Sequence, residues 1–336
     1  MPIERSRRAV RLATGTALCT ALSYGLALPV PFIAPVLAWL LLSTLNQPLP
    51  WQAAVKLALV AAITTSTGLL LIEMLRYYPV SAVLLVGCCL YLTFAFGLRG
   101  GNALVVTFIV IGLCLISSAG VASFALAAMV IAALLKGLIL AVATVTFSHW
   151  LFPETASQMA PVARPLMAAE QVRQTALQGV LIVMPTLVLA LLDPASFLPI
   201  ILKAATLGQQ TSALQARHAG RELVGSTLLG GLLAVAFWCA LSLFVHLWML
   251  LLWMLLFGLL LARRQYGLAA GRFSPGFWLN TMLTMIILLG QSIQDSALGK
   301  DVYTAFAIRM GLFTGLALYA GLMMRWLGGR LNVQPS

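Results

Sequence analysis

The chain has 336 residues, of which 62% are hydrophobic and only 8% are charged, and its mean hydropathy is +1.02. A soluble domain of this size cannot bury so much apolar surface, so the composition excludes a soluble protein and predicts an all-α, polytopic membrane protein. The formal net charge of +12 would suggest nucleic-acid binding in a soluble chain, but here it indicates topology, because Lys and Arg collect in cytoplasmic loops.

Apolar runs of about 17–25 residues fill nearly the whole chain and predict about twelve transmembrane helices. Residues 1–151 and 172–336 are each expected to hold six of them, joined by a more polar cytoplasmic linker at residues 152–171. The arginine-rich start lacks an Ala-x-Ala-like cleavage site, so it predicts an uncleaved first helix rather than a secretory signal. The expected helices are Ala9–Leu28, Val30–Asn46, Trp51–Leu75, Pro79–Gly97, Ala103–Ala119, Val121–Leu151, Val172–Leu192, Pro194–Thr211, Ala219–Phe244, Leu247–Ala262, Pro275–Ile293 and Tyr303–Leu327.

The distribution of basic residues predicts the orientation of these helices. With both termini in the cytoplasm, fifteen Lys and Arg residues fall inside and only Arg76 and Lys300 fall outside. The other three, Lys136, Lys203 and Arg309, lie within predicted spans. The bias follows the positive-inside rule, and inverting the topology would reverse it.

The two halves resemble a weak internal repeat, in which VRLATGTALCTAL at Val10 is similar to VRQTALQGVLIVM at Val172. Six helices per half give both halves the same orientation, which predicts two parallel repeats about an axis along the membrane normal. The alignment pairs Arg11 with Arg173, Pro35 with Pro199, Trp39 with Lys203, Asn46 with Gln210 and Lys56 with Arg221. Its four basic residues, Arg11, Lys56, Arg173 and Arg221, are expected at cytoplasmic helix ends.

The segment Pro194–Gln210 is the strongest candidate for a binding site. Pro199 lacks an N–H, so the helix is expected to kink or open there, and Pro35 is expected to break the matching second helix. Lys203, Thr206 and Gln210 follow Pro199 at helical spacing and form one polar stripe. A cation at the centre of a membrane helix costs about 2.5–3.5 kcal/mol on insertion scales, so Lys203 needs compensation.

Lys136 and Arg309 are two further cations inside predicted spans, and the assignment places no acidic residue at mid-membrane beside them. An organic-acid carboxylate would fit that vacancy. The alternative is that these side chains snorkel to an interface or contact carbonyls freed by prolines. Phe306 and Phe313 share the helix face of Arg309, and Trp39 takes the first-half place of Lys203, so an aromatic acid could stack on these rings.

Two readings remain open for Asp193. It fits the N-cap of the helix that Pro194 begins, and it could also carry a coupling proton. The scattered histidines and the cysteines within apolar runs predict neither a metal site nor a bound cofactor. No His–Asp or Ser–His pair is expected at one membrane depth, which argues against an enzyme. The histidines are His149, His218 and His246.

An arginine-led first helix, a short proline-containing second helix and Lys56 at the start of the third resemble the fusaric-acid-resistance superfamily. The segment RELVGSTLLG, with Arg221, Gly225, Ser226 and Gly230, is similar to the arginine, Gly-Thr and Gly pattern of that group, with Ser226 in the threonine's place. The first half looks most like short members of unknown function. Larger members carry a sizeable cytoplasmic domain, which is reduced here to the linker.

The resemblance implies a multi-pass protein of the bacterial inner membrane that exports small organic, including aromatic, carboxylic acids. A periplasmic adaptor of the membrane-fusion type is the partner it suggests. The small-xxx-small pairs Gly311 with Gly315 and Ser226 with Gly230 allow close helix packing within the bundle or between protomers of a homo-oligomer. Since no nucleotide-binding motif is present, we expect a secondary, proton-coupled transporter whose halves alternate access to the site. The alternative is a channel or structural subunit of a larger efflux assembly that transports nothing by itself.

Overall fold

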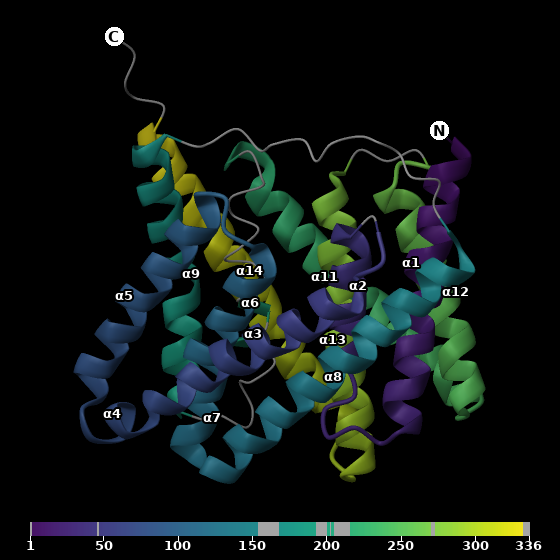
Figure 1. Ribbon diagram of the computed structural model, residues 1–336, viewed down its shortest axis with the longest axis horizontal. Helices are drawn as coiled ribbons and strands as arrows, with labels where there is room; N and C mark the ends of the chain where they lie inside the picture. Colours follow the sequence, from purple (N-terminus) through teal and green to yellow (C-terminus); the bar gives the residue numbers. More distant parts are fainter. Residues whose placement is uncertain are drawn as a thin grey trace. The chain divides into compact units, whose positions relative to one another are not determined.

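The computed structural model of the chain describes residues 2–45, 47–153, 168–192, 200–201, 203–204, 216–269 and 273–331. Throughout these ranges the regular elements are helices, with no strand (Figure 1). The elements are α1 Pro2–Gly25, α2 Ile33–Thr44, α3 Trp51–Leu70, α4 Ile72–Tyr77, α5 Pro79–Leu98, α6 Ala103–Ile111, η1 Gly112–Ile116, α7 Ser117–Ala122, α8 Phe124–Leu151, α9 Ala169–Leu192, α11 Ala216–Leu243, α12 Leu247–Gln265, α13 Pro275–Ala297 and α14 Val302–Leu331.

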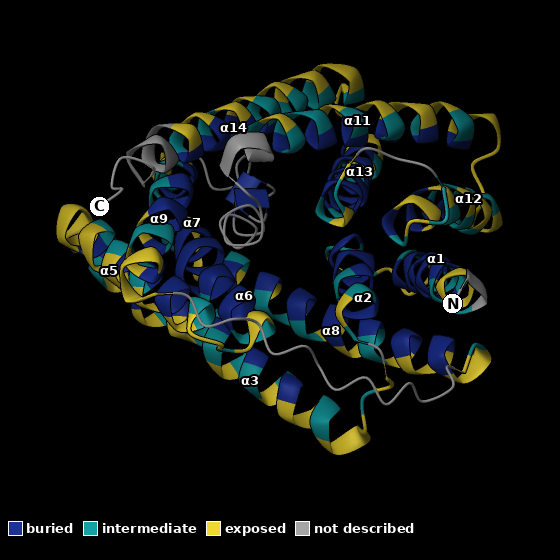
Figure 2. Ribbon diagram, turned by 90° about the horizontal axis from the view of Figure 1, so that it is seen from above, coloured by how far each residue is buried: buried dark blue, intermediate teal, exposed yellow. Residues whose placement is uncertain are grey.

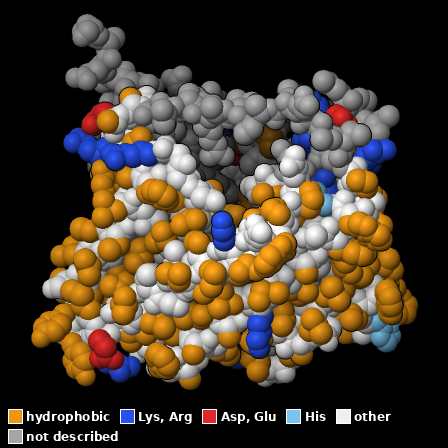
Figure 3. All heavy atoms as spheres, in the orientation of Figure 1, with side chains coloured by type: hydrophobic (Ala, Val, Ile, Leu, Met, Phe, Trp, Pro, Cys, Tyr) orange, Lys and Arg blue, Asp and Glu red, His pale blue; other side chains and the backbone are white. Residues whose placement is uncertain are grey.

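In the part of the chain that the structure describes, 9 helical stretches are long and apolar enough to cross a membrane. Hydrophobic side chains dominate the face drawn in Figure 3. The chain is therefore an all-helical, multi-pass membrane protein, as its composition predicts. The stretches are Trp51–Tyr77, Pro79–Leu98, Ala103–Ala122, Phe124–Leu151, Ala169–Leu192, Gly220–Leu243, Leu247–Gln265, Pro275–Ala297 and Val302–Arg325.

Several helix ends differ from the expected ones. The second helix has only 12 residues, about 18 Å at the usual rise, and is too short to span a bilayer. The break expected near Ala119 lies instead at Ser123, whose backbone is extended. The eleventh expected helix ends at Ala297 rather than Ile293, a difference that matters for the site described below.

The described contacts divide the chain into two compact units. The first comprises Met1–Ala58, Ala132–Gln158 and Glu222–Gly311, and the second comprises Leu59–Ile131, Met159–Arg221 and Leu312–Ser336. Each unit contains segments from both halves of the chain. The organisation into two six-helix repeats with cytoplasmic termini stays a prediction.

In the first unit, α13 is the central helix, with 78% of its apolar window buried. It packs against α2 and α12, and Figure 2 draws it mainly in the buried colour. The hydroxyl of Ser274 caps its start by accepting a hydrogen bond from Phe277 N at 3.3 Å. α1 packs against both α2 and α12. This arrangement buries the helix whose apolar window is the least hydrophobic of the candidate spans.

In the second unit, the stretch Ala103–Ala122 is equally buried. Asn102 caps its start through a 2.9 Å bond from Leu104 N to its side chain, and the helix widens into a π-turn, η1. Gly112 begins that turn and lies backbone to backbone against Gly68 of α3. A side chain at either glycine would collide with the other helix, so this crossing requires glycine at both positions.

Candidate functional site

A tight corner joins α13 to α14 and brings the end of one helix beside the start of the other. Lys300 N donates to the carbonyl of Asp295 at 2.9 Å, and Gly299 adopts φ +68, a left-handed conformation that suits glycine. Asp301 then caps α14, because its side chain accepts from Tyr303 N at 3.1 Å and from the Thr304 hydroxyl. The corner holds the last turn of α13 within reach of the second turn of α14.

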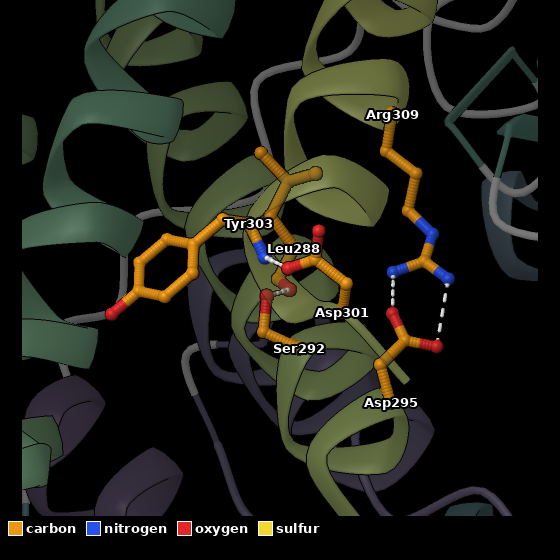
Figure 4. Close-up of polar contacts among 6 residues, drawn as sticks. All are labelled: Leu288, Ser292, Asp295, Asp301, Tyr303 and Arg309. Atoms are coloured by element: carbon orange, nitrogen blue, oxygen red, sulfur yellow. Dashed lines mark hydrogen bonds and ion pairs between the residues drawn. The ribbon is translucent and has the colours of Figure 1, made fainter. Parts of the chain in front are cut away.

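Arg309 and Asp295 form an ion pair across this corner (Figure 4). Arg309 Nη2 donates to Asp295 Oδ1 at 3.1 Å, and Nη1 donates to Oδ2 in a second, shorter bond. Their side chains are only 15% and 5% exposed. Two parallel N–H···O bonds are the preferred geometry of a guanidinium and a carboxylate. The pair is thus a carboxylate-binding arrangement between two candidate membrane spans, α13 and α14.

The expectation that Arg309 has no carboxylate beside it is wrong. It followed from ending the helix before α14 at Ile293, which placed Asp295 in an external loop. α13 continues to Ala297, so Asp295 lies within the helix, is 3% exposed and is directed at Arg309. The helix continues because Gln294, Asp295, Ser296 and Ala297 contain no proline or glycine that would end it.

Buried polar residues continue along α13 from this pair. The Ser292 hydroxyl donates to Leu288 O at 3.0 Å (Figure 4), and Thr284 donates to Asn280 O at 2.7 Å. Each hydroxyl therefore finds an acceptor within its own helix, as a segment without access to water requires. We call these residues the polar face of α13: Asn280, Thr281, Thr284, Ser292 and Asp295, all 3% exposed or less.

The polar face of α13 meets α11 along a close contact. Asn280 Nδ2 donates to Ser226 Oγ at 2.6 Å, and a Cβ added to Gly230 would lie 2.7 Å from Thr281 O. One turn before Ser226, Glu222 accepts a hydrogen bond from Ser274. The contact therefore repeats every four residues along α11. Small and hydrogen-bonding residues are the usual means of close helix association in membranes.

This contact includes three residues of the segment that resembles the fusaric-acid-resistance pattern. Ser226 and Gly230 touch α13 as described, and a Cβ on Gly225 would lie 3.3 Å from the Phe277 ring. Beside them, Thr227 is fully buried, and its hydroxyl has no hydrogen-bond partner among the described residues. The role these positions play in the structure is helix packing around a buried polar layer.

The predicted substrate-binding residues lie in different environments. Lys203 is fully buried, and it belongs to the second unit together with the buried Phe313. Lys136 is exposed on α8, whereas Trp39 is fully buried on α2, and its ring N–H has no partner among the described residues. Phe306 is half-buried one turn before Arg309.

Among the described residues of the first unit, Arg309 bonds to Asp295 and to none of the predicted residues Lys136, Trp39 and Phe306. Four further predictions fall on positions outside the described residues, so the polar stripe after Pro199 and the role of Asp193 stay predictions. These positions are Asp193, Pro199, Thr206 and Gln210.

Pro35 does not break the second helix as predicted. Pro35 lies in the first turn of α2, where the N–H it lacks would have no partner within the helix. The basic residues paired by the proposed repeat also differ from one another. Arg11 is 2% exposed and its carbonyl accepts from the Ser148 hydroxyl at 2.8 Å, whereas Arg173 forms an exposed pair with Glu170 at 3.1 Å.

The remaining predicted basic residues, Lys56 and Arg221, are both exposed. Over the described ranges, no group of three or more His, Cys, Asp and Glu side chains is arranged to hold a metal ion. Sequence reasoning missed the contribution of Asp295, Asn280, Ser226 and Thr227. The available signal was the unusual number of polar residues in the apolar segment that became α13.

Comparison with known proteins gives one match. Residues 8–147 are similar to the family DUF2955, described as a protein family of unknown function. No curated protein matches the chain. No solved structure matches it either. The similarity covers less than half of the chain and carries no activity with it.

Proposed function

We propose that the protein is a secondary transporter that exports small organic carboxylic acids, including aromatic ones, with proton coupling. The observation that carries the proposal is the two-bonded Arg309–Asp295 pair within the candidate spans Val302–Arg325 and Pro275–Ala297. A guanidinium placed in this way already holds one carboxylate in the geometry that a substrate carboxylate would take.

In this proposal the substrate exchanges with Asp295. The incoming carboxylate takes the two guanidinium N–H groups while the Asp295 side chain is released. Arg309 therefore keeps an anionic partner throughout, which avoids the cost of an unpaired cation in a site away from water. Phe306 lies three residues before Arg309 on the same helix face and is half-buried, so it offers an aromatic surface to a substrate ring.

Asp295 is also our candidate for the coupling carboxylate in the described part of the chain. It is buried within a span and bonded to the cation that would receive the substrate. A proton on Asp295 would remove its charge and release Arg309 for the substrate carboxylate, so through this ion pair the proton and the anion would bind together and move in the same direction. Lys203, which is fully buried in the second unit, is proposed to bind an anion there.

The direction of transport, the inner-membrane location and the periplasmic adaptor rest on the resemblance to the fusaric-acid-resistance superfamily. The polar contact between α11 and α13 involves Ser226 and Gly230, two of the residues that carry the resemblance. No ligand-coordinating role is proposed for Gly225, Ser226 or Gly230.

The test is transport by the purified protein in liposomes. Uptake of labelled aromatic acids is followed with a pH gradient alone, a membrane potential alone, and both together. We expect saturable transport by the wild type and at least a tenfold loss in Arg309→Gln and Lys203→Gln. Arg325→Gln, which removes an exposed charge from the same helix α14, is the matched control and should transport normally.

Other outcomes separate the alternatives. Non-saturable flux would indicate a channel, and no flux from any well-folded preparation would favour a structural subunit of a larger assembly. Equal saturable transport by Arg309→Gln and the wild type would exclude Arg309 as the carboxylate site.

A further inference from the structure

The antiparallel pair of α1 and α12 places the start of one helix beside the end of the other. The two helices lie side by side in Figures 1 and 2. A Cβ on Gly258 of α12 would lie 3.3 Å from Ala13 Cβ, and a Cβ on Gly25 would lie 3.2 Å from a methyl carbon of Leu247. Contact therefore runs from the end of α1 at Gly25 to within two turns of its arginine-rich start.

Four exposed arginines gather at this end of the pair, and we call them the basic corner. Arg5 and Arg7 lie in the first two turns of α1, and Arg263 and Arg264 lie in the last turn of α12. Arg5 Nη1 lies only 3.9 Å from the position of a Cβ on Gly267, in the turn that follows α12. Arg5 of α1 therefore reaches the turn that begins directly after α12, three residues beyond Arg264.

The basic corner carries four positive charges, and Glu4, beside Arg5 in the first turn of α1, offsets only one of them. None of the four arginines forms an ion pair with a carboxylate of the described residues. The sequence from Leu247 to Ser274 contains no acidic residue. Four like charges held together in this way repel one another, so an anion bound among them would relieve that repulsion.

Arg264 is fixed in place by an aromatic cluster. Its guanidinium carbon lies 4.9 Å from the centroid of the Trp278 ring, a cation–π distance. Trp278 is 3% exposed and packs edge-on against Phe277 at 5.0 Å between ring centroids. Stacking uses the face of the guanidinium and leaves its N–H groups, which lie in the plane, for hydrogen bonds.

An exposed apolar stripe leads along α12 to this arginine. Leu252, Leu256 and Leu260 are 54%, 45% and 52% exposed and precede Arg264 at steps of four residues. From Leu252 to Arg264 the helix rises about 18 Å, close to the depth of one leaflet of a bilayer. A ligand with an anionic head and a long apolar chain would match both features.

We propose that the basic corner binds the phosphate headgroup of an anionic phospholipid, whose acyl chain lies along Leu252, Leu256 and Leu260. Guanidinium groups bind phosphate oxygens through paired N–H bonds, and basic pockets between membrane helices on the cytoplasmic side suit anionic headgroups. Two arginines from each helix favour a lipid with two phosphates, such as cardiolipin, over one with a single phosphate.

The test is native mass spectrometry of the full chain released from micelles doped with equal amounts of cardiolipin and phosphatidylcholine. We expect the wild type to retain cardiolipin with at least a tenfold preference, and the variant R5Q/R263Q/R264Q to lose that preference. The control K56Q/R99Q/R325Q removes the same charge from exposed positions elsewhere and should behave as the wild type.

Two further arms make the outcome decisive. R264K keeps the charge but loses the planar fork, so it should reduce the preference at least threefold, and it serves as the test if the triple variant fails to fold. Inorganic phosphate should not displace the lipid, because it has no acyl chain. Equal lipid retention by the triple variant and its control would overturn the proposal. A lipid-free dimer whose interface contains these arginines would also overturn it.

Discussion

Arg309 and Lys136 are both basic residues within apolar helices of the first unit, yet they lie in opposite environments. Arg309 donates two hydrogen bonds to the Asp295 carboxylate, and its side chain is 15% exposed. Lys136 is exposed on α8, on the same face as Ile139, which is 61% exposed. Position within an apolar run therefore does not determine what a cation does, because the neighbouring helix decides whether a partner is present.

The difference has a physical cause in the helices themselves. α14 meets the end of α13 through a tight corner, and that end carries an acid. The packed face of α8 next to Lys136 is formed by Gly137, where a Cβ would lie 3.4 Å from the α2 backbone at Ala34. Since Gly137 faces α2, Lys136 is turned outward, and snorkelling of its long side chain to an interface is the simplest account.

The largest expected effect comes from removing the partner of Arg309. Asp295→Leu leaves a buried guanidinium without its carboxylate and should lower the free energy of unfolding by about 3–5 kcal/mol. Denaturant unfolding in detergent micelles measures the change, with Ser296→Ala at an exposed neighbour as control. Asp295→Leu combined with Arg309→Leu should recover much of the loss, and a double variant no better than the single one would contradict the ion pair.

Replacing Lys136 by leucine should change the free energy of unfolding in the opposite direction. Lys136→Leu removes a cation from an exposed, apolar helix face and should raise the free energy of unfolding by up to about 2.5–3.5 kcal/mol in a bilayer-like environment. Lys56→Leu, near the start of α3, is the control and should change stability little. Destabilisation by Lys136→Leu would instead show that Lys136 has a bound partner, such as another subunit or a substrate.

The uncharged pair Asn280 and Ser226, in the same unit, measures what a buried hydrogen bond contributes without charge. Asn280→Leu removes the 2.6 Å bond to Ser226 and should lower the free energy of unfolding by about 1–2 kcal/mol. Ser226→Ala and the double variant complete a mutant cycle, which isolates the pairwise energy. A cost as large as that of Asp295→Leu would mean that charge is not what distinguishes the Arg309 site.

The smallest effect is expected at Asp301, outside the spans. The Thr304 hydroxyl, which donates to its carboxylate, holds the pKa of Asp301 below its ordinary value of 3.8. A depressed pKa means that the carboxylate stabilises the start of α14 at pH values above 3.8, and that this contribution is lost as the pH falls below 3.8 and through the folded-state value.

Hydrogen exchange at the start of α14 checks this prediction, with rates corrected for the intrinsic effect of pH. The wild type should lose protection there on acidification, whereas Asp301→Asn should show no such transition. A transition of equal size in Asp301→Asn would assign it to another group. The polar face of α13 should be unaffected in both proteins.

Much of the fold follows from the sequence because entry into a membrane is decided segment by segment. The apolar stretches at Pro79–Leu98 and Phe124–Leu151 lie within a few residues of the expected helices. The predicted helix ends differ from the observed ones where the sequence signal for an end is weak, as at Ala297, and near a proline, as at Pro35. The candidate site was predicted only in part, since Arg309 was identified and its partner was not.

The sequence by itself determined that this is an all-helical, multi-pass membrane protein, and it identified Lys136, Lys203 and Arg309 as the cations inside its apolar segments. Only the tertiary structure decided that Asp295 binds Arg309 and that Lys136 faces outward. Apolar content is a property of each segment alone, whereas a side chain's partner depends on helix rotation and crossing. Close packing at residues such as Gly137 and Gly230 sets both, and it joins helices that are distant in sequence.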